Sequence, residues 1–162
     1  MDKLKILCLD DQRDVLAALR KDLEVLGDAV AVIACESVAE ADEVLALMDR
    51  HAEEPALIIC DHVMPGKNGI DFLIDFRREG RFPKTRRILL TGLATHRDTI
   101  EAINKARIDH YIEKPWDGAD LVRTVKGLLT RYVLDAGIEY KDYLSVLDQE
   151  VLYGELRKRS VL

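Results

Sequence analysis

The sequence predicts an α/β fold: a doubly wound parallel sheet of five strands with helices on both faces, followed by a helical extension at the C-terminus. Short apolar segments alternate along the chain with longer segments whose apolar residues recur at helical spacing. Several of the short segments are apolar at nearly every position, which is typical of strands covered on both faces. Each intervening helix is then expected to return the chain over the sheet by a right-handed crossover.

The first half of the chain holds three predicted strands, Leu4–Leu9, Ala29–Ala34 and Ala56–Cys60. Apolar residues at helical spacing, up to Leu26, predict a first helix that ends before Gly27. The capping-box pattern from Ser37 to Glu40 predicts the start of the second helix. A third helix, Ile70–Arg78, is expected after a loop that contains Pro65, Gly66 and Gly69.

The second half continues this alternation with two strands, Arg87–Thr91 and Ile108–Ile112, and two helices, Thr95–Lys105 and Gly118–Val133. A boundary near Gly137 is expected to separate a domain of residues 1–134 from an extension of residues 135–162. The chain is long enough for one domain with a proper core and too short for two.

The extension carries an apolar repeat at four-three-four spacing, formed by Tyr140, Leu144, Leu147 and Val151. This repeat predicts an amphipathic helix with a short heptad-like seam. Because an isolated helix of this length is marginally stable in water, it must pack on something. The sequence leaves open whether it packs on its own domain, forms a homodimer or docks on another protein, and whether it links to an output domain that is missing from this chain.

Composition narrows the class of protein. With 48% hydrophobic and 33% charged residues the chain is typical of a globular protein. Its net charge of −6 argues against direct nucleic-acid binding, which depends on clustered Lys and Arg. Cys8, Cys35 and Cys60 lie in apolar runs without the spacing of a zinc site and are expected to be buried, reduced thiols. No segment suggests a signal peptide or a membrane span, so a cytoplasmic location is expected.

The expected site lies at the carboxyl ends of the strands, where ligands bind in doubly wound sheets. Asp10, Asp11 and Asp61 follow two of these strands, and three adjacent carboxylates would disfavour one another's ionisation. Mg²⁺ relieves this, because it takes carboxylate, water and phosphate oxygens in octahedral geometry. Asp61 is then predicted to act as a carboxylate nucleophile that forms an aspartyl phosphate.

Two further strand ends supply partners for such a phosphoryl group. The Lys114 ammonium can pair with one phosphoryl oxygen, and the Thr91 hydroxyl can hydrogen-bond another. Gly92 leaves space for the group to enter, and Pro115 ends the strand and shapes the loop that positions Lys114.

Four segments, Leu9–Asp11, Ile58–Gly69, Leu89–Gly92 and Tyr111–Pro115, resemble in order and spacing the motifs of response-regulator receiver domains of two-component signalling. The resemblance extends over about residues 3 to 134 and implies the flavodoxin-like receiver fold. It implies that Asp61 is the phosphoacceptor and that Asp10, Asp11, Asp61 and the backbone carbonyl of Val63 hold Mg²⁺. It also implies that Thr91, Tyr111 and Lys114 form the switch, and that a sensor histidine kinase or a phosphotransfer protein is the partner.

The chain departs from the commonest receivers at Val63 and Leu93, where the family often carries polar side chains that orient the hydrolytic water. Both are apolar here, which predicts a long-lived phosphorylated state. The sequence disfavours two other functions. A phosphatase-like enzyme with an aspartyl-phosphate intermediate is disfavoured because Asp10-Asp11-Gln12 lacks the Asp-x-Asp pair of haloacid-dehalogenase-like phosphatases. A phosphorylation-independent interaction module is disfavoured because no acid or lysine of the site is missing.

Overall fold

The computed structural model describes residues 1–92, 100–101 and 104–160. Its strands are β1 (Leu4–Leu9), β2 (Val30–Cys35), β3 (Leu57–Asp61), β4 (Arg86–Thr91) and β5 (His110–Glu113). Its α-helices are α1 (Arg13–Leu23), α2 (Val38–Arg50), α3 (Gly69–Glu79), α5 (Gly118–Asp135) and α6 (Gln149–Ser160), with 3-10 helices η1 (Glu24–Ala29) and η2 (Tyr140–Val146). The helix predicted at Thr95–Lys105 falls largely outside the described residues.

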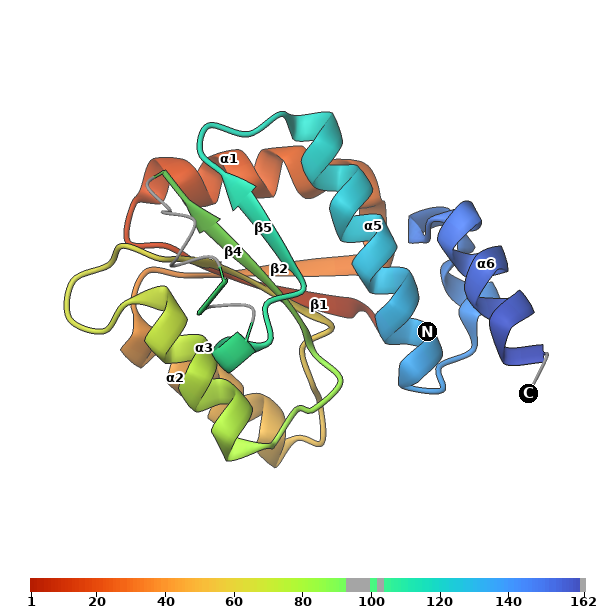
Figure 1. Cartoon of the computed structure of the whole chain (residues 1–162), viewed down its shortest axis with the longest axis horizontal. Helices are drawn as coiled ribbons and strands as arrows, with labels where there is room; N and C mark the ends of the chain where they lie inside the picture. The colour runs from red at the N-terminus through yellow and green to blue at the C-terminus, as the bar shows by residue number, and fades with distance from the viewer. Residues whose placement is uncertain (93–99, 102–103, 161–162) are drawn as a thin grey trace.

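The five strands form one parallel sheet in the order β2-β1-β3-β4-β5, which confirms the predicted fold class (Figure 1). The chain moves outward from β1 to β2 and then returns to the other side of β1 with β3, so the strand order reverses between β1 and β3. This reversal places the carboxyl ends of β1 and β3 side by side, with Leu9 paired to Cys60. The residues that follow, Asp10 and Asp61, therefore meet at the switch point of the sheet.

Each face of the sheet supports its own apolar core. Alternate residues of β1 point to opposite faces, so Ile6 and Cys8 join one core while Leu7 and Leu9 join the other. The first core is covered by α1 and α5, and the second by α2 and α3. All five residues of β3 are buried, as the doubly covered strand pattern predicts.

Two boundaries differ from the predictions for reasons that the backbone shows. The apolar repeat through Leu26 predicts one helix, but α1 ends at Leu23 and the chain continues as η1, in which Gly27 has a φ of 68°. Leu26 remains buried, because the 3-10 turn still presents it to the core. The last strand begins at His110 instead of Ile108, since Arg107 adopts a φ of 51° and Ile108 packs into the second core before pairing with β4 begins.

The three thiols are core residues, as predicted. Cys8, Cys35 and Cys60 are buried and none forms a disulfide. Burial raises the pKa of the Cys8 and Cys35 thiols to about 12, and it raises that of Cys60 as well. In the described part of the chain, no helix combines the length and apolar character that a bilayer crossing requires.

The heptad-like seam predicted for the extension does not form a single helix. Tyr140 and Leu144 lie in η2, Leu147 is extended, and Val151 belongs to the separate helix α6. The break is stabilised by Asp148, whose carboxylate accepts the Val151 N–H at 3.1 Å and whose own N–H donates to the Thr130 hydroxyl at 2.9 Å. The repeat identified the buried face only in part: Leu147 is 4% exposed as expected, but Leu144 is 42% exposed. The repeat also missed the buried side chains of Tyr143, Val146 and Leu152.

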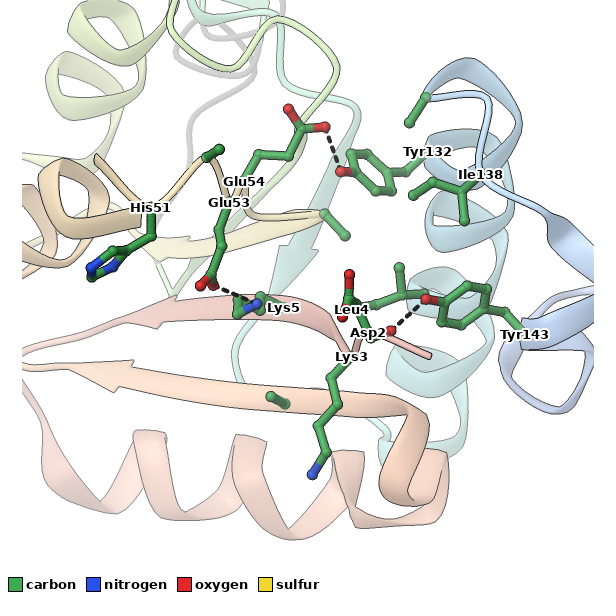
Figure 2. A pocket seen from close by; sticks show the side chains of 14 residues that line it. Asp2, Lys3, Leu4, Lys5, His51, Glu53, Glu54, Tyr132, Ile138 and Tyr143 are labelled. Carbon is green, nitrogen blue, oxygen red and sulfur yellow. Dashed lines mark hydrogen bonds and ion pairs between the residues drawn. The ribbon is translucent and has the colours of Figure 1, made fainter. Parts of the chain in front are cut away.

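The extension packs against the rest of the chain beside α5 and β1. Its buried side chains Tyr143, Val146 and Leu147 join the core under α1 and α5, and Leu152 of α6 is fully buried as well. Figure 2 shows the pocket at this junction, where the Tyr143 hydroxyl donates to the Asp2 carbonyl and the Tyr132 hydroxyl donates to Glu54 at 2.5 Å. Packing on its own domain therefore buries part of the apolar surface of the extension, while Leu144 and Tyr153 stay exposed.

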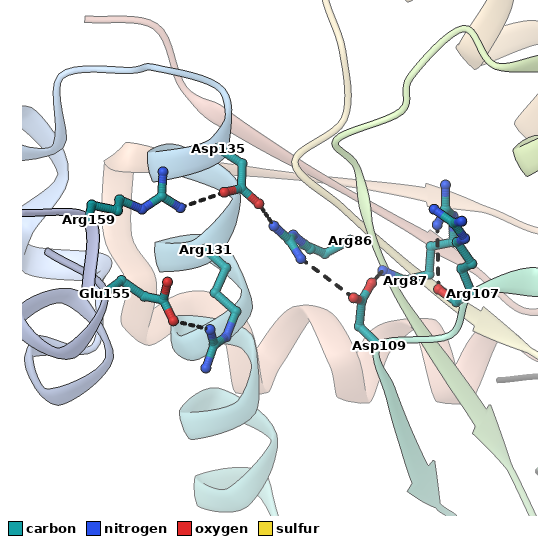
Figure 3. Close-up of polar contacts among 8 residues, drawn as sticks. All are labelled: Arg86, Arg87, Arg107, Asp109, Arg131, Asp135, Glu155 and Arg159. Atoms are coloured by element: carbon teal, nitrogen blue, oxygen red, sulfur yellow. Dashed lines mark hydrogen bonds and ion pairs between the residues drawn. The ribbon is translucent and has the colours of Figure 1, made fainter. Parts of the chain in front are cut away.

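Ion pairs line the outer side of the same junction (Figure 3). Arg131 of α5 meets Glu155 of α6 at 2.6 Å, and Asp135 bridges Arg159 of α6 and Arg86 of β4. Partly exposed pairs of this kind contribute at most about 1 kcal/mol each. Burial of apolar side chains is consequently the main attachment of α6.

We expect Leu152→Ala to lower the free energy of unfolding by about 2–5 kcal/mol, because Leu152 is fully buried and its loss leaves a cavity. The neighbouring control Tyr153→Ala, at a position 56% exposed, should change it by less than about 0.5 kcal/mol. Urea unfolding followed by circular dichroism measures both. Equal effects of the two substitutions would contradict the packing described for α6.

Candidate functional site

The site is built at the carboxyl ends of four neighbouring strands. Asp10 follows β1, Asp61 ends β3, Thr91 ends β4 and Lys114 follows β5. The Lys114 N–H donates to the Thr91 carbonyl at 2.8 Å, so the backbone ladder of β4 and β5 extends as far as the lysine. This extension fixes the point from which the Lys114 side chain reaches across the sheet edge.

Three carboxylates gather there. Asp10, Asp11 and Asp61 each offer an oxygen within 4.8 Å of the other two, and only Asp11 of the three is exposed. Asp10 is wholly buried, and its carboxylate accepts the Gln12 N–H at 2.8 Å. The sequence prediction that these three acids converge is borne out in their positions.

The Lys114 ammonium lies between two of the carboxylates. Its Nζ is 3.0 Å from Asp10 Oδ2 and 3.0 Å from Asp61 Oδ1. Three carboxylates and one ammonium leave two net negative charges at the site. A divalent cation would neutralise that remainder.

The electrostatics follow from burial and from these pairs. Burial raises the pKa of Asp61 above its ordinary value, and the charge of Asp10 raises it further, while the hydrogen bond and charge of Lys114 act in the opposite direction. Burial acts to lower the pKa of Lys114, but the hydrogen bonds and charges of Asp10 and Asp61 outweigh it, so that this pKa is raised. Lys114 is therefore a cation throughout the physiological range.

Glycine is required where the loop after β3 passes the site. The Gly69 N–H donates to the His62 carbonyl at 2.8 Å, and a Cβ on Gly69 would lie 2.0 Å from the Asp61 carbonyl oxygen. Any side chain there would displace the backbone of Asp61. Gly66 in the same loop has a φ of 79°, and Pro65 precedes it.

The remaining predicted residues lie around this centre. Thr91 is fully buried, and Tyr111 is half-buried against the core under α2 and α3. Among the described residues, a Cβ on Gly92 would meet no heavy atom within 4 Å, so these residues leave open space beside it. The Val63 side chain is 64% exposed two residues beyond Asp61, and the Lys114–Pro115 peptide bond is cis. Leu93 lies outside the described residues.

One contact near the site was not predicted. The Trp116 indole N–H donates to the Asp22 carboxylate at 2.7 Å, linking the loop after β5 to the end of α1. The two residues are 94 positions apart. The only signal in the sequence is that a half-buried tryptophan needs an acceptor for its N–H, which does not identify the acceptor.

The comparisons with known proteins agree with this geometry. The family model of the response regulator receiver domain matches residues 6–126. The hydrogenase transcriptional regulatory protein HoxA of Cupriavidus necator is 36% identical over 121 residues, which cover 75% of this chain and 23% of that protein. The response regulator Rre1 of Synechocystis is 31% identical over 158 residues, covering 96% of this chain and 63% of Rre1. The chain thus spans from about a quarter to under two thirds of these relatives.

Solved structures show the same fold. The signal receiver domain of an HD domain-containing protein from Pseudomonas fluorescens Pf-5 superposes with a TM-score of 0.71 at 27% identity, covering 81% of this chain and 98% of that one. A response regulator receiver domain protein from Clostridium thermocellum superposes with a TM-score of 0.68 at 26% identity, with the same coverage. Together with the family match over residues 6–126, these likenesses show that the chain belongs to the response regulator receiver domain family.

Proposed function

We propose that this chain is a phosphoryl-accepting switch in which Asp61 takes a phosphoryl group from a histidine kinase or a phosphotransfer protein. The observation that carries the proposal is the placement of the Lys114 ammonium 3.0 Å from both Asp10 and Asp61, within a set of three converging carboxylates. Such a cluster suits transfer of a phosphoryl group, in which catalysis consists largely of positioning and charge stabilisation.

In the proposed step a carboxylate oxygen of Asp61 attacks the phosphorus of a phosphohistidine in line with the leaving imidazole. A P–O bond to Asp61 forms as the P–N bond breaks, and the bonding electrons leave with the imidazole nitrogen. The Lys114 ammonium, already beside Asp61, pairs with one phosphoryl oxygen. A small acyl phosphate would react in the same way, with a carboxylate as the leaving group.

The donor set fits Mg²⁺. It consists of oxygens alone, and Mg²⁺ binds oxygens at about 2.1 Å, so that two of its ligands stand at most about 4.2 Å apart. The oxygens of Asp10, Asp11 and Asp61, within 4.8 Å of one another, approach that span. We assign these three carboxylates and the Val63 carbonyl as the protein ligands. When bound, the cation would neutralise charge that develops on the transferring group.

The proposed switch connects this site to a surface. Thr91 lies at the end of β4 next to the open space beside Gly92, where its hydroxyl would hydrogen-bond a phosphoryl oxygen. Tyr111 lies on the adjacent strand, in register with Leu89 of β4. We propose that engagement of Thr91 draws the Tyr111 ring inward and so changes the surface over β5.

The partners follow from the family. Receiver domains of two-component response regulators work with histidine kinases and with output domains, and relatives such as HoxA and CpxR are named as transcriptional regulatory proteins. We propose that this chain signals through a protein partner or through an output domain outside residues 1–162, and not through nucleic acid directly, because its net charge is −6. Its three buried free thiols suit the reducing cytoplasm.

Asp61 should be the single phosphoacceptor. Incubated with acetyl phosphate and Mg²⁺, the protein should gain one phosphoryl group by intact mass spectrometry, and Asp61→Asn should gain none, because its amide is not a nucleophile. Asp71→Asn, at an exposed acid of α3, is the matched control and should be labelled normally. Undiminished labelling of Asp61→Asn would refute the assignment, and a wild type without label would favour the phosphorylation-independent module.

The phosphorylated state should be long-lived. Val63 and Leu93 offer no hydrogen bond to an attacking water, so Val63→Asn combined with Leu93→Glu should speed loss of the phosphoryl group by about tenfold, equivalent to about 1.4 kcal/mol of barrier. The rate is read from the decay of the phosphorylated mass after removal of the donor. A wild type that loses the group within seconds, at a rate the double substitution leaves unchanged, would contradict this prediction.

Phosphorylation should also change how the chain associates with a second copy of itself or with a protein partner. If the surface over Tyr111 has two states, a beryllofluoride complex that mimics the acyl phosphate should shift the molar mass measured by light scattering, or the affinity for a partner. Leu144→Asp, at an exposed position of η2, tests whether the extension takes part in a homodimer without disturbing its buried face. A mass that is unchanged by beryllofluoride would remove homodimerisation as the output.

A further inference from the structure

The loop between β5 and α5 is anchored at two places, one just before α1 and one near the end of α1. At its start, the Lys114 ammonium meets Asp10, just before α1 begins. Two residues later, the Trp116 indole N–H donates to Asp22, the second-last residue of α1. Figure 1 shows this loop passing along α1 before α5 begins. The described structure thus fixes a loop of four residues, from Lys114 to Asp117, near both ends of one helix.

The surroundings of Trp116 and Asp22 favour their hydrogen bond. A Cβ on Gly118, the first residue of α5, would lie 3.0 Å from Asp22 Oδ1, so glycine allows the Asp22 carboxylate to approach the start of α5 closely. A carboxylate near a helix N-terminus is favoured by the helix dipole. The Trp116 ring packs on the core under α1 and α5, which orients its N–H toward α1.

We propose that Asp22 and Trp116 are a positioning pair for Lys114: their hydrogen bond fixes the loop backbone so that the ammonium is delivered between Asp10 and Asp61. The proposal rests on the proposed function, and it assigns to that site two residues that lie outside it. Neither side chain touches the reacting atoms, so each acts only through the loop.

The physical reason lies in the lysine side chain. Its four-carbon stem has many rotamers, so the location of its charge depends on the backbone that carries it. On one side that backbone is held by the hydrogen bond from the Lys114 N–H to the Thr91 carbonyl. On the other side of Lys114, the nearest side chain along the loop that ties it to another element is Trp116, through its hydrogen bond to Asp22. Without this hydrogen bond the loop can shift and displace the ammonium. A small displacement of a catalytic group strongly reduces the rate of a reaction that depends on exact positioning.

The test compares four variants of the full chain. Asp22→Ala removes the acceptor, Trp116→Phe removes the N–H while keeping an aromatic ring, and Asp22→Asn removes the charge while keeping an acceptor oxygen. Glu24→Ala, which removes an exposed carboxylate two residues from Asp22, is the matched control. Urea unfolding followed by circular dichroism establishes that each variant is folded at the assay temperature. In the variants that keep Trp116, the one tryptophan of the chain, its emission reports the pair directly.

Phosphorylation by acetyl phosphate is measured over a range of donor concentrations at saturating Mg²⁺. The maximal rate should fall about three- to tenfold in Asp22→Ala and in Trp116→Phe, which is the effect expected for loss of one ordinary hydrogen bond, with an unchanged half-saturating donor concentration. Asp22→Asn and Glu24→Ala should stay within about twofold of the wild type. Wild-type rates in Asp22→Ala and Trp116→Phe would overturn the proposal, and so would an Asp22→Asn rate as low as that of Asp22→Ala, because charge alone would then matter.

A second readout separates this inference from the proposed function. Acylation of the Lys114 amine by an N-hydroxysuccinimide ester, followed by peptide mass spectrometry, does not require phosphorylation. Asp22→Ala and Trp116→Phe should label Lys114 faster than the wild type does, because the ammonium leaves its two carboxylates more often. A wild type that takes no phosphoryl group would refute the proposed function alone, whereas equal Lys114 labelling in all variants would refute the positioning pair.

Discussion

The ammonium of Lys114, held between Asp10 and Asp61, is the interaction on which the rest of the site depends. A fully buried carboxylate such as Asp10 is stable only when it is paired and hydrogen-bonded, and it receives both from Lys114 and from the Gln12 N–H. Asp61 is buried beside it. The lysine therefore offsets part of the charge and leaves a remainder that a divalent cation can neutralise.

The fold brings residues that are far apart in the sequence together at the carboxyl ends of the strands. The reversal of strand order between β1 and β3 places Asp10 beside Asp61, and the ladder between β4 and β5 carries Lys114 to them from the far side. The loops add tight constraints. Gly69 passes so close to the Asp61 backbone that no Cβ fits, and the loop after Lys114 is tied to α1 through Trp116. The edge strand β5 thus leads to the counter-charge, and the inner strands β1 and β3 lead to the buried carboxylates.

Much of this could be predicted because it is encoded locally. An apolar strand that ends in an acid or a lysine identifies both the element and its site residue, as at Asp10, Asp61 and Lys114, and parallel order then brings these ends together. Contacts between residues far apart in the chain could not be predicted in this way. Nothing in the sequence joins Trp116 to Asp22, and the apolar repeat of the extension gave no sign that Asp148 would interrupt it by pairing with Thr130. The start of β5 was misplaced because Ile108 continues the strand pattern, while the backbone turns at Arg107.

The central claim is that the three carboxylates and Lys114 form one cluster whose remaining negative charge accepts a divalent cation. Calorimetric titration of Mg²⁺ into the wild type and into Lys114→Met tests it most directly. Because the Lys114 ammonium repels the cation and occupies two of its carboxylates, Mg²⁺ should bind more tightly to Lys114→Met, whereas Asp11→Asn should weaken binding. Mg²⁺ affinity that is unchanged by both substitutions, or absent in the wild type, would contradict this account.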